Sequence, residues 1–185
     1  ANEILDMAVG PGGRLWVLHP HSLLSRFDGE GWSSFAPEGV GLTSNPIGYH
    51  LAIDQDGVKW ITTQEGVLSF DDAAWARYDQ TNSGLETRFL DNAAVDSRNV
   101  KWFGTLMLGP EGSGVYSFDG TEWKHYTAEN SGLHSNTVTA IGADSQGNVW
   151  FSTYERGHSR FDGTQWFESD DPAFCADHIR EGPDG

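Results

Sequence analysis

The chain has 185 residues, of which 37% are hydrophobic and 12% aromatic, so it is long enough and apolar enough to bury the core of one domain. Its 27 acidic and 11 basic side chains give a net charge of −16, which repels phosphate backbones and argues against a nucleic-acid partner. No apolar run approaches the roughly 18 residues of a transmembrane helix, so we expect no membrane insertion of this segment.

Eight tryptophans mark four copies of one repeated unit. In each copy the first tryptophan lies within a short apolar stretch, and the second follows a Phe-Asp pair at a fixed spacing. The pairs in chain order are Trp16 and Trp32, Trp60 and Trp75, Trp102 and Trp123, and Trp150 and Trp166. A period of about 43 residues with several strands per unit is typical of β-propeller blades.

Each copy predicts four short strands. The first carries small and branched residues, as in 51–53, and a tight turn such as 54–57 follows, in which aspartate accepts backbone hydrogen bonds and glycine adopts a positive φ. The tryptophan strand comes next. A third strand such as 114–118 then ends in the hairpin signal Asp119-Gly120, and the fourth begins at the second tryptophan. We therefore expect blades at about 4–36, 48–79, 89–127 and 137–168.

The tryptophans are predicted to be structural. A twisted four-stranded sheet cannot bury either face alone, so blades gain stability by stacking face to face. Burying an indole ring stabilises such a stack by a few kcal/mol, and the regular register of the eight rings favours this packing over a platform that stacks sugars. We expect all eight rings to fill the junctions between blades.

The last residues predict that the array continues. Residues 182–185 (Gly-Pro-Asp-Gly) align with 10–13 (Gly-Pro-Gly-Gly) four periods earlier, so 176–185 reads as the start of a fifth blade. The expected fold is an all-β propeller of four four-stranded blades plus the first strand of a fifth, as part of a larger propeller. The alternative is a closed ring of four blades with an accessory strand. Open ends would bind missing blades or another chain.

Candidate ligand-binding residues lie in the loops after the second strands. Blade three carries an insertion at 106–113, which is either a contact loop or a tolerated surface insertion. Blades one and four carry histidines and charged residues that would bind a metal or perform acid–base chemistry if they met across the axis, and are otherwise solvated. Because neither loop alone has metal-site spacing, we predict no metal ligands and no catalytic residues. The candidates are Leu106, Met107 and Glu111, with His19, His21, Glu155, Arg156 and His158.

Calcium is the one cofactor considered. The turn at Asp54 matches a calcium-binding loop at Asp54, Asp56 and Glu65 only, and it lacks the glycine of the sixth position. Aspartate recurs at the same turn in blades three and four, as Asp96 and Asp144, which favours a hydrogen-bonded aspartate turn over a calcium site. We therefore predict no cofactor.

One stretch of the sequence resembles the two-component-regulator propeller repeat. It comprises Asn130-Ser131-Gly132-Leu133, Asn136, Val138, Ile141, Asp144, Gly147, Asn148, Val149 and Trp150, followed by Phe161-Asp162-Gly163. A second copy of its beginning stands at 82–85 and a degenerate copy at 39–42, so the resemblance covers residues 4 to 168.

The resemblance implies a function that the residues do not show by themselves. Propellers of this family are bacterial and often form extracytoplasmic sensor parts of signalling proteins, periplasmic or extracellular. It therefore implies a non-catalytic module that binds a protein or small ligand on its loop-rich face. Two alternatives remain open: a building block of an extracellular or surface assembly, and an enzyme similar to the streptogramin-inactivating propeller lyases that uses the histidine loops.

Overall fold

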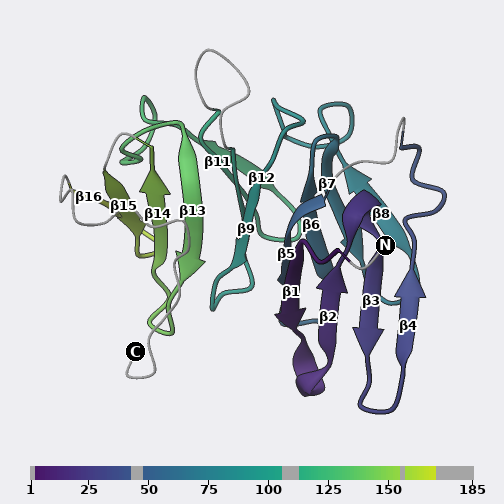
Figure 1. Cartoon of the computed structure of the whole chain (residues 1–185). Coiled ribbons are helices and arrows are strands. Elements are labelled where there is room, and N and C mark those ends of the chain that lie inside the picture. The colour runs from purple at the N-terminus through teal and green to yellow at the C-terminus, as the bar shows by residue number, and fades with distance from the viewer. Residues whose placement is uncertain (1–2, 43–47, 106–112, 155–156, 170–185) are drawn as a thin grey trace.

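The computed structural model describes residues 3–42, 48–105, 113–154 and 157–169, and over these it is an all-β protein. Within these ranges, sixteen strands form four antiparallel sheets of four strands each, and every sheet is a meander in chain order. Figure 1 shows the sheets following one another from the N-terminal sheet in purple to the C-terminal sheet in green. The expected fold class is confirmed. The segment 176–185, expected to begin a fifth blade, lies outside the described residues.

The four sheets are called blades one to four. Blade one consists of β1 (Asp6–Val9), β2 (Leu15–Leu18), β3 (Leu24–Phe27) and β4 (Trp32–Phe35). Blade two consists of β5 (Gly48–Ile53), β6 (Lys59–Thr63), β7 (Gly66–Phe70) and β8 (Trp75–Tyr78). Blade three consists of β9 (Asn92–Val95), β10 (Lys101–Gly104), β11 (Val115–Phe118) and β12 (Trp123–Tyr126). Blade four consists of β13 (Val138–Ala143), β14 (Val149–Thr153), β15 (His158–Phe161) and β16 (Trp166–Ser169).

The strand register gives each blade two different faces. Residues directly opposite each other in antiparallel strands share a face, so one row of paired residues runs across all four strands. In blade two the row that contains Lys59 and the second tryptophan, Trp75, faces blade one. The neighbouring row contains the first tryptophan, Trp60, and faces blade three. The first strands β1, β5, β9 and β13 follow one another along the inner side.

Three hydrophobic clusters fill the three junctions between successive blades. At the junction of blades two and three, the Trp60 ring lies 5.6 Å from Tyr78, 6.1 Å from Phe103 and 5.8 Å from Phe118. The first tryptophans of blades one to three are buried, and the second tryptophans of blades two to four pack against the same clusters. Six of the eight indoles therefore contribute to junctions, as expected.

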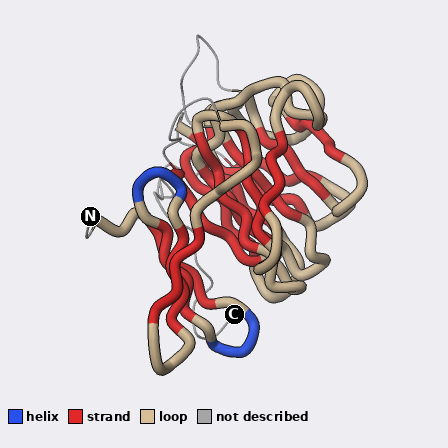
Figure 2. The backbone as a smooth tube through the Cα atoms, turned by 90° about the vertical axis from the view of Figure 1, so that its right-hand side faces the viewer, coloured by secondary structure: helices blue, strands red, loops and turns tan. Residues whose placement is uncertain are grey.

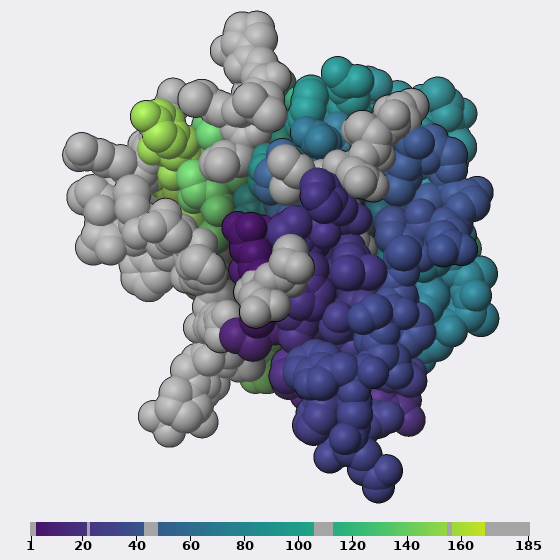
Figure 3. All heavy atoms as spheres, turned by 45° about the vertical axis from the view of Figure 1, so that its right-hand side comes forward, coloured from purple at the N-terminus to yellow at the C-terminus, as the bar shows by residue number. Residues whose placement is uncertain are grey.

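Trp32 departs from this expectation because 59% of it is exposed. It lies in the row Val9, Leu15, Phe27 and Trp32, on the face of blade one that points away from blade two. Figure 3 shows blade one at the surface in purple and blue. Trp150 is half-buried, on the face of blade four that points away from blade three. No described blade packs against either face, which explains both exposures.

The Asn-Ser-Gly-Leu segments, 82–85 and 130–133, pack against the blade that follows them. Leu85 and Leu133 are buried at the junctions. A Cβ atom on Gly84 or Gly132 would overlap the side chains of Trp123 and Trp166, respectively. Only glycine therefore allows the connecting loop to lie against the second tryptophan of the following blade.

A cation lies at each of the three junctions. The Lys59 ammonium lies 4.3 Å from the Trp16 ring, and the Lys101 ammonium lies 5.3 Å from the Trp60 ring. The corresponding residue of blade four is Val149, and there Arg98 of blade three supplies the charge instead. The Arg98 guanidinium lies 5.9 Å from the Phe161 ring and donates to the Asp162 carbonyl across the junction.

Candidate functional site

Alternating strand direction places the connections of each blade at two ends. Loops between second and third strands, and those between blades, lie at one end, the loop-rich end. Turns between first and second strands, and between third and fourth strands, lie at the other, the hairpin end. Figure 2 shows this for blade one, whose two 3-10 turns, η1 (Pro11–Gly13) and η2 (Pro20–Ser22), lie at opposite ends of its sheet.

His19, at the loop-rich end, is held within blade one. Its Nδ1 lies 2.9 Å from the Glu3 carbonyl oxygen and its Nε2 lies 3.0 Å from the Ser25 hydroxyl. Because a carbonyl only accepts, Nδ1 donates to it and Nε2 accepts from the serine. In the other blades a threonine in the same position donates to a glycine carbonyl; these are Thr63, Thr105 and Thr153. His19 thus closes the loop of its blade.

Of the other sequence-predicted candidates, His21 and His158 lie among the described residues. His21 is exposed in the turn η2, with a φ of 66°, and the His158 ring lies 6.3 Å from the Trp150 ring. Within the described part of the chain, no group of three His, Cys, Asp or Glu residues is arranged to hold a metal ion. Leu106, Met107, Glu111, Glu155 and Arg156 lie outside the described residues.

A polar cluster at the inner side was not predicted from the sequence. Asp6 Oδ2 accepts a hydrogen bond of 2.7 Å from the Leu51 backbone N–H and lies 3.3 Å from His50 Nδ1. Burial, together with the negative charge of Asp91, raises the pKa of Tyr49. These residues stand at the beginnings of β1, β5 and β9, so blades one, two and three each contribute a polar group at the loop-rich end.

This axial cluster, comprising Asp6, Tyr49, His50 and Asp91, offers two carboxylates, a phenol and an imidazole. Carboxylates accept hydrogen bonds and attract cations, and the phenol and imidazole donate or accept. The signal was present in the sequence, because each of these residues lies at or just before the start of a predicted first strand. A polar residue at the start of a strand that otherwise carries small and branched side chains marks the axis.

The carboxylates of the aspartates in the turns between first and second strands accept hydrogen bonds from their own blade. Asp54 Oδ1 accepts from the backbone N–H groups of Asp56 and Val58, and Asp54 Oδ2 accepts from the Trp60 indole at 2.9 Å. Asp96 and Asp144 accept from Trp102 and Trp150 in the same way. Blades two to four therefore each contain a hydrogen-bonded aspartate turn.

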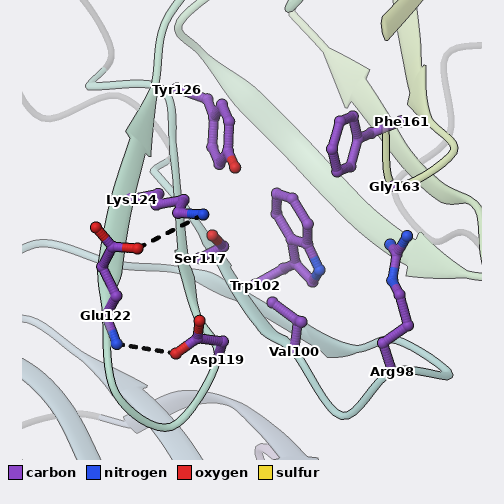
Figure 4. A pocket seen from close by; sticks show the side chains of 10 residues that line it. All are labelled: Arg98, Val100, Trp102, Ser117, Asp119, Glu122, Lys124, Tyr126, Phe161 and Gly163. Atoms are coloured by element: carbon purple, nitrogen blue, oxygen red, sulfur yellow. Dashed lines mark hydrogen bonds and ion pairs between the residues drawn. The ribbon is translucent and has the colours of Figure 1, made fainter. Parts of the chain in front are cut away.

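A pocket of about 210 Å³ opens at the hairpin end between blades three and four (Figure 4). The Trp102 indole, the Tyr126 ring and Phe161 form its aromatic wall, and Ser117 lies opposite Trp102 in the sheet. Charged side chains stand around it. They are Arg98, Asp119, Glu122 and Lys124. Of the candidate ligand-binding residues that lie in the described part of the chain, none lines this pocket.

The charged residues around the pocket form ion pairs or hydrogen bonds with neighbouring residues. The Arg98 guanidinium donates to Asp96 Oδ2 at 2.8 Å, and the Lys124 ammonium lies 3.6 Å from Glu122. Hydrogen bonds from the Glu122 backbone N–H, and from the hydroxyl and backbone N–H of Thr121, lower the pKa of Asp119 to about 2, so it is a carboxylate at neutral pH.

Among the described residues, no helix has the length and apolarity of a membrane span. No curated protein matches the chain at a significant level. Residues 132–155 match the family model described as two component regulator propeller.

Solved structures share the fold. The extracellular domain of BT3049 from B. thetaiotaomicron, described as a hybrid two component system, is 24% identical with a TM-score of 0.70, over 91% of this chain and 23% of that one. The extracellular domain of BT4673 from the same organism, described as a one component system, is 18% identical with a TM-score of 0.65, over 93% of this chain and 25% of that one.

Virginiamycin B lyase from Staphylococcus aureus is 12% identical with a TM-score of 0.67, over 88% of this chain and 54% of that one. The chain therefore spans from about a quarter to about half the length of these structures. At these identities the likeness concerns the fold. Residues 132–155 thus match a two component regulator propeller repeat, and the described part of the chain folds as an array of β-propeller blades.

Proposed function

We propose that the chain is a non-catalytic binding module of an extracytoplasmic bacterial sensor protein, and that the axial cluster at its loop-rich end contacts the ligand or protein partner. The observation that carries the proposal is the convergence of Asp6, His50 and Tyr49 with Asp91, contributed by three different blades. The repeat match and the likeness to extracellular domains of bacterial two component and one component systems support the sensory setting.

The chemistry of the cluster favours ligands with hydroxyl or amine groups. Asp6 and Asp91 are acceptors, and the net charge of −16 favours cationic over anionic partners. A neutral polyol would satisfy the same acceptors through its hydroxyl hydrogens. The ligand class is therefore a glycan or an amine rather than a phosphate or a carboxylic acid.

The test is a thermal-shift screen of the chain against oligosaccharides and polyamines, followed by calorimetry on the compounds that stabilise it. Asp91→Asn should weaken the binding of such a compound at least fivefold. The matched control is Glu30→Gln, which removes the same charge at the hairpin end of blade one and should leave affinity unchanged. A compound that binds wild type and Asp91→Asn equally would show that the axial cluster is not its site.

A second candidate function, a building block of an assembly, is favoured by the outward face of blade one. Val9 is 68% exposed and Trp32 is 59% exposed on that face, and exposed apolar side chains that lie together are common at protein interfaces. Sedimentation velocity of wild type and Trp32→Ser tests it. Self-association that the substitution removes would support assembly through this face, and a monomer at all concentrations would reject it. The lyase alternative has less support, because both His19 ring nitrogens are hydrogen-bonded within blade one.

A further inference from the structure

Two sheet faces at the ends of the array, on blades one and four, have no partner among the described blades (Figure 1). At each of the three junctions, the face with the first tryptophan of one blade packs against the face with the second tryptophan of the next. The second-tryptophan face of blade one and the first-tryptophan face of blade four are therefore the two halves of a fourth junction of the same kind.

The outward face of blade one is built like the faces that lie within the junctions. Its Phe27 and Trp32 rings lie 5.2 Å apart. The corresponding pairs of blades two, three and four lie within junctions, with ring separations of 4.7, 4.7 and 5.0 Å. Met7, on the same face as Val9, is 60% exposed. The partner that such a face fits is another blade.

This face lacks a cation that the corresponding faces of the other three blades have. In blades two, three and four a cation lies over the phenylalanine of the aromatic pair. The distances are 5.0 Å for Lys59 over Phe70, 5.8 Å for Lys101 over Phe118, and 5.9 Å for Arg98 over Phe161. No cation of the described residues lies over Phe27, because Leu15 stands at the position of Lys59. A blade that covers this face must bring the charge itself, as blade three does for blade four through Arg98.

The outward face of blade four carries such a charge. The Arg160 guanidinium carbon lies 5.6 Å from the Trp150 ring and 4.2 Å from Phe167. Phe167 is 41% exposed, and Arg160 and Trp150 are half-buried. Arg26 lies over Trp16 at the same position of blade one, on the face that blade two covers. An arginine stacked at this position is therefore compatible with a junction between blades.

We propose that a second copy of this chain binds head to tail, with the outward face of its blade four on the outward face of blade one, and the reverse at the other end. One face offers an aromatic pair without a cation, and the other offers a tryptophan with one. Two copies bring eight blades and leave neither face open, and eight is within the usual range of about four to eight blades in a propeller. The proposal rests on the second candidate function above and names its partner.

The experiment is sedimentation velocity over a concentration series. We expect wild type to form a dimer and nothing larger, because a closed ring has no open face. Trp32→Asp and Phe167→Asp each place a charge on one of the two faces, and each should raise the dimer dissociation constant at least about tenfold. Ala128→Asp adds the same charge to an exposed residue of the loop after β12, and this matched control should dimerise as wild type does.

The outcomes separate this proposal from the assembly role. A monomeric wild type would overturn both. Self-association that Trp32→Asp removes and Phe167→Asp leaves unchanged would keep assembly through blade one and overturn head-to-tail pairing. Species larger than a dimer would overturn the ring of two chains. Both substituted residues are exposed, so each variant should keep the thermal midpoint of wild type.

Mixing the two variants distinguishes head-to-tail pairing from pairing of two like faces. A Trp32→Asp chain keeps blade four intact and a Phe167→Asp chain keeps blade one intact, so together they retain one complete junction. In fluorescence anisotropy, a labelled Trp32→Asp chain should bind the Phe167→Asp chain at least about fivefold more tightly than it binds unlabelled Trp32→Asp chain. Equal binding of the two would overturn the proposal.

The cation of the proposed junction has its own test. Arg160→Ser removes it, and Leu15→Lys supplies one from the opposite face. The double variant copies the junction of blades two and three, where Ser69 stands opposite Trp60 and Lys101 lies over that ring. Arg160→Ser should raise the dimer dissociation constant at least about fivefold, and adding Leu15→Lys should return it to within about twofold of wild type. An unchanged dissociation constant for Arg160→Ser, or no recovery in the double variant, would overturn the proposal.

Discussion

The ammonium of Lys59 in blade two lies 4.3 Å from the indole ring of Trp16 in blade one. Lys59 is fully buried, and it donates hydrogen bonds of 2.6 Å to Asp72 and 2.8 Å to the Gly57 carbonyl. A buried ammonium is tolerated only when its charge and its donors are matched, and here an aromatic face, a carboxylate and a carbonyl do so. The junction of blades one and two is therefore held by a charge as well as by apolar packing.

We predict that Lys59→Met, which keeps most of the side-chain volume, lowers the free energy of unfolding by about 1–3 kcal/mol. The loss arises because the cation–π contact and two hydrogen bonds disappear. Urea denaturation followed by tryptophan fluorescence measures it. Lys124→Met is the matched control, because the Lys124 side chain is 53% exposed, and it should change stability by less than about 0.5 kcal/mol. Equal effects of the two changes would contradict the structural role of Lys59.

At the junction of blades three and four, Arg98 takes the role that a lysine has at the other two junctions, so a lysine placed there should restore the stability that is lost without Arg98. Arg98→Ala removes the cation that pairs with Asp96 and leaves that carboxylate buried without a counter-charge, so it should destabilise the protein. Adding Val149→Lys restores a lysine at the position that Lys59 and Lys101 hold. The double variant should recover at least half of the lost stability in urea denaturation. Val149→Lys alone should not raise the stability of the wild-type protein, because Arg98 and the new lysine would then bring two cations to one junction. If the effects of the two substitutions on stability are simply additive, the introduced lysine does not take over the role of Arg98.

The turn aspartates make the fold sensitive to acid. Hydrogen bonds from backbone N–H groups lower the pKa of Asp28, Asp71 and Asp162, and that of Asp119 falls to about 2. A carboxyl group whose pKa is lower in the folded state stabilises the fold fully above its unfolded pKa, and the contribution is lost as pH falls through the folded value. Stability should therefore decline between about pH 4 and about pH 2.

The measurement is urea denaturation at pH 6, 4 and 2.5. Asp119→Asn keeps an acceptor oxygen in the turn and cannot titrate, so the variant should lose less stability than wild type between pH 4 and 2.5. Glu168→Gln removes an exposed acid from β16 and should follow the wild-type curve. A wild-type stability that does not change below pH 4 would contradict this account.

The glycines of the Asn-Ser-Gly-Leu segments should be intolerant of substitution. Gly132→Ala places a methyl group against the Trp166 side chain, so the loop or the ring must move, at a cost of about 1–3 kcal/mol. A methyl group on Gly31 would meet no atom within 4 Å, and Gly31 has no positive φ, so Gly31→Ala is the control and should stay within about 0.5 kcal/mol of wild type. Thermal and urea denaturation measure both, and equal values would contradict the close packing.

The blades were predictable because each one must bury a sheet face against the next blade and uses the same residues to do so. A tryptophan such as Trp60 recurs wherever a sheet face must be covered by the next sheet, and that recurrence is visible in the chain. Exposure of Trp32 was not predictable from the pattern, since its row in blade one is equivalent to the buried rows and only the neighbouring blade differs.

The candidate sites were less predictable because they depend on positions that break the repeat. His19 resembled a free loop residue, and its role emerged from the threonines that replace it in the other blades. The axial cluster joins residues of three blades that are far apart in sequence, such as Asp6 and His50.

The changing origin of the junction cation means that these blades are not interchangeable parts. Placing blade four directly after blade two would bring Val149 against Trp60 and leave Asp54 without Lys101. Duplicating blade three would bring Arg98 and Lys101 to one junction. Shuffling or grafting of such repeats thus succeeds only between neighbours whose counter-charges fit, which is a rule for anyone who would build longer arrays from this chain.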